Sequence, residues 1–303
     1  MDDSDTSDVW ARQPLLTASG LDQQQLPRAL YVVATPIGNA ADVTLRALWV
    51  LRNADCIAAE DTRVSAPLLK RYGIQARLIA FHRHNERTAT PQLLARLSKG
   101  ERVALVSDAG TPGVSDPGAL LVRAALAAGE RVVPIPGPSS LTAALSVAGL
   151  QTASVRLLGF LPARAPARRR LLQQAAASNE PFVLLEAPHR IADTARDLAA
   201  CLPPDRRIVL ARELTKLFEA VVQTTASALV RTVDEQGQRG EFIVVVDAGE
   251  RAEPEVAGLD ETGQRWLRAL AGELPVARAA AVAAKATGVA RETVYRALLA
   301  ERD

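Results

Sequence analysis

The segment 107–118 carries the densest group of residues that can do chemistry. It reads Ser-Asp-Ala-Gly-Thr-Pro-Gly-Val-Ser-Asp-Pro-Gly and directly follows the apolar run 103–106. Glycine permits positive φ and close backbone approach, while proline fixes φ and removes an amide donor, so neither a helix nor a strand is expected to continue here. Open α/β sheets bind ligands at the carboxyl ends of their strands, and the segment therefore predicts a binding loop rather than a plain surface turn.

The composition of these turns favours a cofactor without phosphates. The turn 35–39 has one glycine and no Gly-x-Gly-x-x-Gly spacing, and the chain has no Walker lysine motif. NAD and ATP are disfavoured, since a pyrophosphate needs several backbone donors and Pro36 removes one. S-adenosylmethionine fits better, because Asp108 can accept hydrogen bonds from its ribose hydroxyls and carbonyls or carboxylates can face its sulfonium.

The elements that must position these loops alternate along the first half of the chain. Apolar runs predict strands at 29–34, 56–59, 77–81, 103–106 and 132–135. Helical spacing predicts helices at 42–52, 67–72, 91–98, 119–128 and 141–147, the last capped by Ser139 and Ser140. This alternation indicates a parallel α/β sheet with its loops collected on one edge.

The pattern divides the chain into four parts. Residues 1–27 are acidic and poorly periodic, which predicts a disordered tail. An N-terminal α/β domain is expected at 28–149, and a second α/β domain with more strand and some antiparallel pairing at 150–250. Residues 262–303 predict a small helical, helix-turn-helix-like unit, with helices at 276–287 and 291–299. This unit either packs as a small bundle or contacts nucleic acid.

Composition bounds the class of protein. The 303 residues are 48% hydrophobic and 23% charged, which is ordinary for a globular chain. With two distant cysteines and three histidines, no metal site is expected. No apolar stretch has the length of a transmembrane helix and no signal-peptide pattern is present, so a cytoplasmic location is expected. Of the 36 basic residues 32 are arginine, and a run at Arg164 and 168–170 is a candidate phosphate contact.

Six segments, in order, resemble the signatures of one bacterial family. They are 31–39 (Tyr-Val-Val-Ala-Thr-Pro-Ile-Gly-Asn), 59–63 (Ala-Glu-Asp-Thr-Arg), 107–112, 133–139 (Val-Pro-Ile-Pro-Gly-Pro-Ser), 159–162 (Gly-Phe-Leu-Pro) and 211–216 (Ala-Arg-Glu-Leu-Thr-Lys). The family is that of the ribosomal RNA small subunit methyltransferases I, members of the tetrapyrrole methylase fold. The resemblance covers roughly 29–246, and the C-terminal helices resemble that family's small terminal domain.

The resemblance implies S-adenosylmethionine-dependent methylation of the ribose 2′-oxygen of a cytidine in the decoding region of 16S rRNA. It also implies a cofactor cleft between two α/β domains, and usually a homodimer acting on the small ribosomal subunit or an assembly intermediate. The implied cofactor-binding residues are Pro36, Asp108, Ala109, Gly110, Ser139, Gly159 and Phe160. Residues implied near the acceptor are Glu60, Asp61, Arg63, Glu186, His189, Arg212, Glu213 and Lys216, to which we add Arg164 and Arg168 as RNA contacts. The chain departs from the family pattern at Leu185 and Ala187.

A ribose hydroxyl is a weak nucleophile, so methyl transfer needs a base, in-line geometry, or both. The candidate catalytic residues are Lys216, Glu186 and Asp61, and Lys216 qualifies as a base only if its pKa is lowered. The alternative roles are structural or electrostatic: Lys216 as a phosphate contact, Asp61 in a local pair with Arg63, and His189 as a residue at a helix start.

Two other functions are compatible with the sequence. The same fold supports methylation of small tetrapyrroles, because a fold does not fix its substrate. A non-catalytic RNA-binding factor for ribosome assembly would retain RNA affinity without binding the cofactor. Labelled methyl transfer, measured into ribosomal subunits and into a uroporphyrinogen-type acceptor, tests the first alternative. Calorimetric titration with the cofactor tests the second.

Overall fold

The computed structural model describes residues 17–21, 23–114, 116–151, 154–178, 180–248, 269–270 and 272–300, which fall into two compact units divided after Asp247. Most of the predicted tail, residues 1–16 and 22, lies outside the described residues, as does Ser115 of the 107–118 loop. Both α/β sheets belong to the first unit, so the division at 149/150 stays a prediction. Within the described ranges, no helix is both long and apolar enough to span a membrane.

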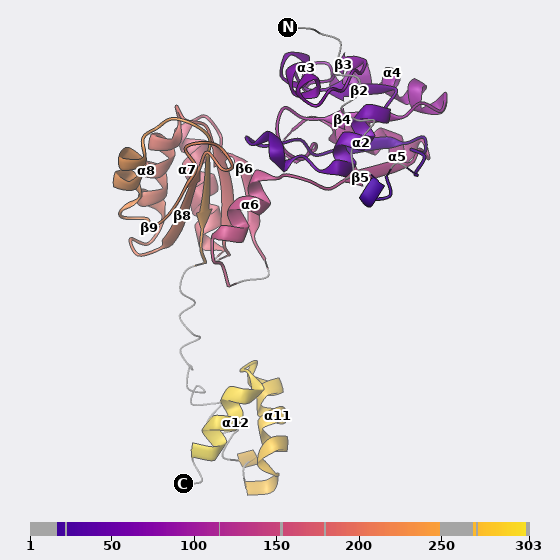
Figure 1. Cartoon of the computed structure of the whole chain (residues 1–303). Coiled ribbons are helices and arrows are strands. Elements are labelled where there is room, and N and C mark those ends of the chain that lie inside the picture. Colours follow the sequence, from indigo (N-terminus) through magenta and orange to yellow (C-terminus); the bar gives the residue numbers. More distant parts are fainter. Residues whose placement is uncertain are drawn as a thin grey trace. The chain divides into compact units, whose positions relative to one another are not determined.

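The first sheet is parallel throughout and has the strand order β3-β2-β4-β1-β5. Its strands are β1 (Leu30–Val33), β2 (Cys56–Ala59), β3 (Leu78–Ala80), β4 (Val103–Val106) and β5 (Val132–Ile135). All five lie where the sequence predicts them, and β2, β4 and β5 have the predicted bounds. Because the strands are parallel, the loops after β1, β2 and β4 emerge at the same sheet edge (Figure 1).

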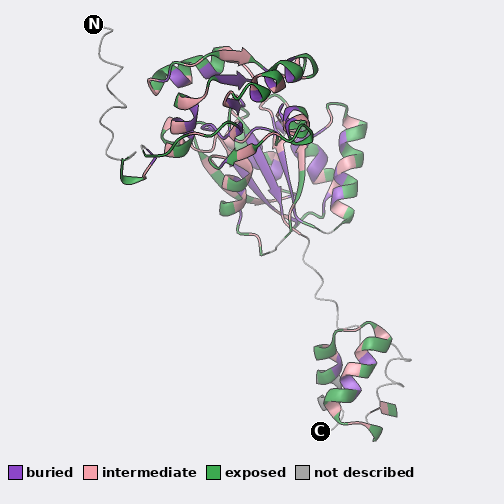
Figure 2. Ribbon diagram, turned by 90° about the vertical axis from the view of Figure 1, so that its right-hand side faces the viewer, coloured by how far each residue is buried: buried purple, intermediate pink, exposed green. Residues whose placement is uncertain are grey.

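Side chains alternate across this sheet and bury two separate cores. Tyr31 and Val33 belong to one cluster and Leu30 to the other, and the alternation repeats along β2 and β4. Helices α2 (Leu45–Asn53) and α3 (Thr62–Arg71) cover the first face, while α4 (Glu86–Ser98) and α5 (Ala119–Ala127) cover the second. Figure 2 colours the buried residues of the strands purple and shows exposed residues in green on the outer helices.

Several helix starts differ from the predictions. Helix α2 begins at Leu45, three residues after the predicted start at 42, because Thr44 caps it. Helices α3 and α4 begin at Thr62 and Glu86, each five residues before the proline that was taken as the start. Pro67 and Pro91 are each the sixth residue of their helix, past the first turn, where each removes one i→i−4 hydrogen bond. The predicted serine cap also fails, because Ser139 precedes α6 (Ser140–Val147) but its side chain accepts no capping hydrogen bond.

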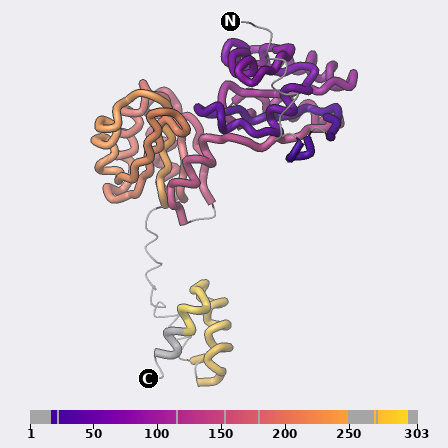
Figure 3. Tube along the Cα trace, viewed as in Figure 1, coloured from indigo at the N-terminus to yellow at the C-terminus, as the bar shows by residue number. Residues whose placement is uncertain are grey.

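The second sheet is mixed and has the order β6-β7-β10-β8-β9. Its strands are β6 (Arg156–Phe160), β7 (Phe182–Glu186), β8 (Arg207–Arg212), β9 (Ala220–Thr225) and β10 (Phe242–Val246). Only β6 and β7 are parallel, and β10 pairs antiparallel with both β7 and β8. The predicted antiparallel pairing is confirmed. Figure 3 shows these strands as the pink-to-orange part of the chain.

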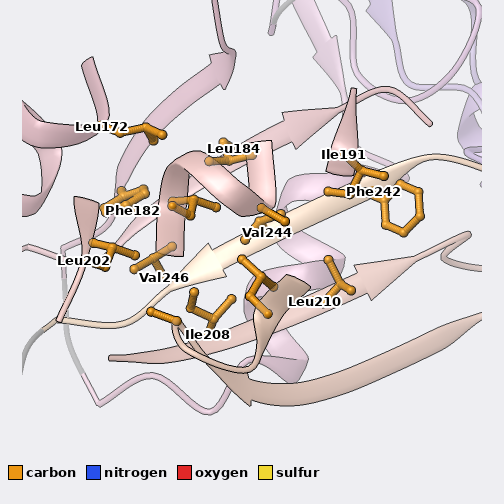
Figure 4. Close-up of a cluster of buried hydrophobic side chains, with 14 of the residues drawn as sticks. Leu172, Phe182, Leu184, Ile191, Leu202, Ile208, Leu210, Phe242, Val244 and Val246 are labelled. Atoms are coloured by element: carbon orange, nitrogen blue, oxygen red, sulfur yellow. The ribbon is translucent and has the colours of Figure 1, made fainter. Parts of the chain in front are cut away.

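This sheet also separates two cores. One face carries a large apolar cluster against α7 (Ala165–Ala177), α8 (Ile191–Cys201) and α9 (Leu229–Gln236), and Figure 4 shows its side chains, with Phe182, Val244 and Leu210 among those labelled. The other face packs Val183, Val245 and their neighbours against α6. The sequence pattern predicted no bounds for α7, α8, α9 or β9, although a helix start was expected near His189 and α8 begins at Ile191.

The second unit contains two helices joined by a short turn. Helix α11 (Val276–Thr287) has the predicted bounds, and Gly288 ends it in the left-handed conformation with φ 72°. Helix α12 (Arg291–Ala300) follows and packs on α11 through Ala279, Ala283 and Val294. The predicted helix-turn-helix arrangement is confirmed for these residues, while 262–268, 271 and 301–303 lie outside the described part of the chain.

Candidate functional site

The loops after β1 and β4 are joined at the edge of the first sheet. Thr35 and Gly110 form an antiparallel bridge, with N···O distances of 2.9 and 3.0 Å between their backbone groups. The Thr35 hydroxyl donates to the Ser107 carbonyl at 3.1 Å. Gly110 has φ 79°, and a Cβ there would lie 3.3 Å from the Ile37 side chain. The glycine therefore serves both the turn and the close packing of the two loops.

The far half of the 107–118 loop is held by a carboxylate from α4. Glu86 Oε1 accepts hydrogen bonds from the backbone N–H groups of Gly118 at 3.0 Å and Leu120 at 3.1 Å. The carboxylate thus satisfies donors at the N-terminus of α5, where a negative charge is favourable. Gly118 has φ 134°, and a Cβ there would lie 2.8 Å from Leu105 Cδ2. The Gly118 end of the loop is therefore held by α4 and by its packing on Leu105.

A cavity of about 400 Å³ lies against this loop, in the size range of small-molecule sites. Both sheets of the first unit contribute to its wall. The lining residues are Ile37, Glu60, Asp108, Ala109, Gly110, Thr111, Val114, Asp116, Ser139, Ser140, Leu141, Phe160, Leu185, Glu186, Ala187, Pro188, Ala211, Leu214, Glu241, Phe242 and Ile243. Five of these described lining residues are carboxylates, and none is lysine, arginine or histidine. The wall is therefore acidic.

Three of the carboxylates crowd one another at the ends of β2 and β4. Burial, together with the charges of Glu60 and Asp108, raises the pKa of Asp116 to about 6. Burial also raises the pKa of Glu60 and of Asp108. Asp108 Oδ1 accepts the Asp61 N–H at 2.9 Å, and Glu60 Oε2 accepts the Asp108 N–H at 3.4 Å. In the described residues, no group of three or more His, Cys, Asp or Glu side chains is arranged to hold a metal ion.

Most of the predicted cofactor residues lie at this cavity. Asp108, Ala109, Gly110, Ser139 and Phe160 line it. Pro36 and Gly159 are not among the lining residues but immediately precede Ile37 and Phe160, which are. Sequence reasoning missed Asp116 and Glu241 as site residues. Asp116 stands in the same loop as Asp108, so loop membership was a signal that could have found it.

Glu186 lines the cavity, but its carboxylate is already satisfied within the protein. Thr194 donates its hydroxyl to Oε2 at 2.6 Å, and the Ala187 N–H donates to Oε1 at 3.0 Å. Arg190 Nε lies 3.2 Å from Oε1, and the Glu186 side chain has no solvent exposure. Accepting a proton from a substrate would disrupt these contacts. The structure therefore disfavours Glu186 as the base.

Lys216 is held by two glutamates and is not among the lining residues of the cavity. Its Nζ lies 2.8 Å from Glu213 Oε1 and 3.0 Å from Glu241 Oε2. Burial lowers the pKa of Lys216, but the hydrogen bonds and charges of Glu213 and Glu241 outweigh this effect and the pKa is raised. The requirement for a lowered pKa is not met, which disfavours Lys216 as a base and favours its role as a fixed positive charge.

The segment 213–216 is strained and interlocks with the loop after β1. Glu213 and Thr215 have φ of 49° and 67°, which non-glycine residues rarely adopt. The Thr215 hydroxyl accepts the Asn39 N–H at 3.0 Å. A Cβ on Gly38 would lie 2.4 Å from Lys216 Cγ. Only glycine allows this approach, which brings Ile37 and Leu214 to the cavity wall from the two sheets.

Asp61 and Arg63 form a local pair. The carboxylate caps α3 by accepting the Arg63 N–H at 2.8 Å, and Arg63 Nη2 lies 2.6 Å from Asp61 Oδ2. These hydrogen bonds lower the pKa of Asp61 to about 2, which makes it a weak proton acceptor. The contacts of Asp61 therefore agree with its alternative role, a local pair with Arg63 that fixes the loop.

Arg168 corrects the interpretation of the basic run. Its side chain is 6% exposed, and its Nε lies 2.6 Å from Asp197 Oδ2, itself 3% exposed. Helical periodicity turns Arg168 into the core while Arg169 and Arg170 remain on the exposed side of α7. Arg168 is thus a buried structural residue and cannot be a surface contact for RNA, whereas Arg164 is exposed at the N-terminus of α7.

The other predicted acceptor residues occupy varied positions. His189 is exposed in the turn before α8, two residues ahead of the helix start. The Arg212 guanidinium donates to the carbonyls of Arg239 and Gln236, both at 2.7 Å. The Glu213 carboxylate accepts the Glu241 N–H at 3.0 Å and holds Lys216. Arg212 and Glu213 therefore stabilise the strained segment.

Comparison with known proteins places this site in a family. The sequence model of the tetrapyrrole (corrin/porphyrin) methylases matches residues 29–230, and that of the RsmI C-terminal HTH domain matches residues 257–302. Ribosomal RNA small subunit methyltransferase I from Neisseria meningitidis serogroup B is 46% identical over 268 residues, covering 88% of this chain and 91% of the relative. The chain belongs to the ribosomal RNA small subunit methyltransferase I family.

Further relatives and solved structures agree. The same-named proteins of Escherichia coli O157:H7 and Pseudomonas aeruginosa are 45% and 46% identical, covering 90% and 89% of this chain and 95% and 96% of theirs. The structure of the cobalt precorrin-4 methyltransferase CbiF aligns with a TM-score of 0.55 at 21% identity, over 72% of this chain and 94% of that one. Uroporphyrin-III-C-methyltransferase from Thermus thermophilus aligns with a TM-score of 0.51 at 23% identity, with the same coverage. These structural likenesses show the fold, and the expected tetrapyrrole methylase architecture is confirmed.

Proposed function

We propose that this protein transfers a methyl group from S-adenosylmethionine to the ribose 2′-oxygen of a cytidine in the decoding region of 16S rRNA. The family supports methyl transfer to ribosomal RNA, since its relatives carry that name. The observation that carries the donor is the wall of the cavity, which has five carboxylates and no basic side chain among its described lining residues.

The lining residues fit a cationic, phosphate-free donor. A nicotinamide or adenine nucleotide would bring phosphates against Glu60, Asp108 and Asp116, and burial of unpaired like charges is costly. S-adenosylmethionine carries a sulfonium and an ammonium group and no phosphate. Asp108 and backbone groups of the 107–111 segment would hold its polar parts, while Phe160 and Leu141 supply apolar surface. When bound, the donor supplies a methyl group already activated by the positive sulfur.

The acceptor hydroxyl must lose its proton to a residue that is ionised yet basic enough. Three predicted candidates fit this role poorly because of their contacts. Lys216 is paired with two glutamates, the Glu186 carboxylate is already hydrogen-bonded, and Asp61 is paired with Arg63. The pocket-facing carboxylates Asp116 and Asp108 remain, and a carboxylate with a pKa near 6 accepts protons better than one with an ordinary pKa. Methyl transfer to oxygen then leaves a neutral thioether product and a protonated carboxylate.

Basic residues outside the cavity lining would contact the RNA. The exposed Arg63 and Arg164 and the half-buried Lys216 are candidates for phosphate contacts, and His189 directly follows the lining residue Pro188. Tyr295 and Arg291 of the second unit are further candidates for RNA contact. We further propose a cytoplasmic homodimer that acts on 16S rRNA in the small subunit or an assembly intermediate.

The test is methyl transfer with the acceptor varied. Purified protein is incubated with labelled S-adenosylmethionine and, separately, undermethylated 30S subunits, free 16S rRNA or a uroporphyrinogen-type acceptor. Label in the subunit, mapped by mass spectrometry to the ribose of one cytidine, supports the proposal. Label in the tetrapyrrole alone, or in a base rather than a ribose, contradicts it.

Asp108→Ala provides the matched variant for the donor site. Its titration with S-adenosylmethionine should show loss of binding, because Asp108 lines the cavity and also accepts the Asp61 N–H. Retained affinity would remove the ribose assignment of Asp108. Absence of S-adenosylmethionine binding by the wild-type protein, with RNA affinity retained, would support the non-catalytic alternative.

A further inference from the structure

Among the carboxylates that line the cavity, Asp116 is the one whose negative charge is least compensated by contacts within the protein. The groups that face it are Glu60 after β2, Asp108 and Ser107 after β4, and Arg83 after β3. The carboxylates oppose its ionisation, while the Ser107 hydroxyl and the Arg83 charge favour it. Glu60 and Asp108 each accept a backbone N–H, which compensates their charge in part. An additional positive charge in the cavity would therefore act most strongly on Asp116.

The loop that carries Asp116 is anchored at Thr111 and at Gly118. Pro117 limits the backbone directly after it, and Gly118 is fixed by Glu86 and by its packing on Leu105. On the other side, Thr111 donates its hydroxyl to the Pro138 carbonyl at 3.1 Å. Asp116 lies between these two anchored positions in the sequence and lines the cavity. Its charge is thus coupled to the charge of whatever occupies the cavity.

We propose that Asp116 is a specificity-determining residue that distinguishes the sulfonium donor from the thioether product. This inference rests on the proposed function, because it assumes S-adenosylmethionine as the donor. S-adenosylmethionine and S-adenosylhomocysteine differ by one methyl group and one positive charge at sulfur. The ionised Asp116 attracts the sulfonium, whereas the neutral thioether offers it no such attraction. After the methyl group is transferred, the pocket therefore binds the product more weakly than it bound the donor.

The coupling has a defined sign. A cation bound near Asp116 favours the ionised carboxylate, so binding lowers the pKa of Asp116 from about 6 and releases a proton. Affinity for the donor consequently increases as pH rises through 6. A decrease of one pKa unit corresponds to a change in affinity of about tenfold between the protonated and ionised limits. The thioether lacks the charge and should show little of this dependence.

Calorimetric titration of the full-length protein tests the inference without turnover. S-adenosylmethionine and S-adenosylhomocysteine are titrated separately between pH 5 and pH 8, in buffers of different ionisation enthalpy. We expect donor affinity to rise about tenfold over this range, with net proton release, and product affinity to change less than about threefold. Asp116→Asn should remove the pH dependence and reduce donor affinity about tenfold near neutral pH, while leaving product affinity near the wild-type value.

Asp193→Asn is the control, because it changes the net charge equally on an exposed part of α8 and does not line the cavity. Thermal unfolding of both variants checks folding, and the wild-type titrations stand by themselves if Asp116→Asn does not fold. If both ligands bind but their affinity ratio is independent of pH and of Asp116, the inference is wrong while the proposed function stands. If the wild type binds neither ligand at any pH, the proposed function itself fails.

Discussion

Arg168→Met tests whether the basic run of α7 stabilises the fold or binds substrate. Both side chains of the Arg168–Asp197 pair are almost fully buried, and their Nε–Oδ2 distance is 2.6 Å. Removing one partner of a buried ion pair costs about 3–5 kcal/mol, because the other charge is left without compensation. Arg169 still contacts Asp197 Oδ1 at 2.6 Å, so we expect the lower end, about 3 kcal/mol. For a unit of this size, that loss lowers the melting temperature by roughly 6–12 °C.

Arg169→Met is the matched control, because Arg169 contacts the same carboxylate while its side chain is 59% exposed. A pair with one exposed partner contributes about 1 kcal/mol or less. Urea unfolding at neutral pH measures both variants. A loss below about 1 kcal/mol in Arg168→Met, or equal losses in the two variants, would refute the reasoning. Unchanged stability with weakened RNA binding would restore Arg168 as a substrate contact.

A second measurement is the pH dependence of the stability that Arg168→Met loses relative to wild type. Burial raises the pKa of Asp197, but the hydrogen bonds of Arg169 and Arg168 outweigh it and the pKa is lowered. A carboxylate with a lowered folded-state pKa contributes stability above its unfolded pKa, and that contribution is lost as pH falls through the folded value. The difference in the free energy of unfolding between wild type and Arg168→Met should therefore be largest near pH 7 and decrease below about pH 4. A gap that is constant down to pH 2 would contradict the assignment.

Two other predictions concern the strained segment 213–216. Gly38→Ala should destabilise the protein by about 1–3 kcal/mol and weaken donor binding, since its Cβ would lie 2.4 Å from Lys216 Cγ; Gly272→Ala, with open space around it, should be neutral or slightly stabilising in the same unfolding assay. Lys216→Arg, which keeps a positive charge but cannot act as a base, should retain at least about a tenth of turnover, whereas Lys216→Met should lose more. Loss of turnover in a well-folded Lys216→Arg would return Lys216 to the role of base.

Local sequence patterns were sufficient to predict the strands of the first sheet and the loop that forms the site. Short apolar runs such as 103–106 have few alternatives when Gly, Pro and Asp follow directly, and β4 has the predicted bounds. The helix starts were missed where proline was read as a first-turn residue, because the Asp61 cap and the chain before Pro67 decide where α3 begins. Ordered motifs also predicted the family, since they depend on residue order alone.

The burial, pairing and protonation of the charged residues in these motifs depend on the tertiary structure. Arg168 and Arg169 are adjacent in sequence, yet the helix turns one toward the buried Asp197 and leaves the other exposed. Glu186 accepts a hydrogen bond from Thr194, and the charge of Glu60, which lies 56 residues away along the chain, helps to raise the pKa of Asp116. The protonation and availability of a side chain depend on burial and on the charges within a few ångströms. Those neighbours are brought together by the fold, so residue types and spacing locate the site but do not assign its chemistry.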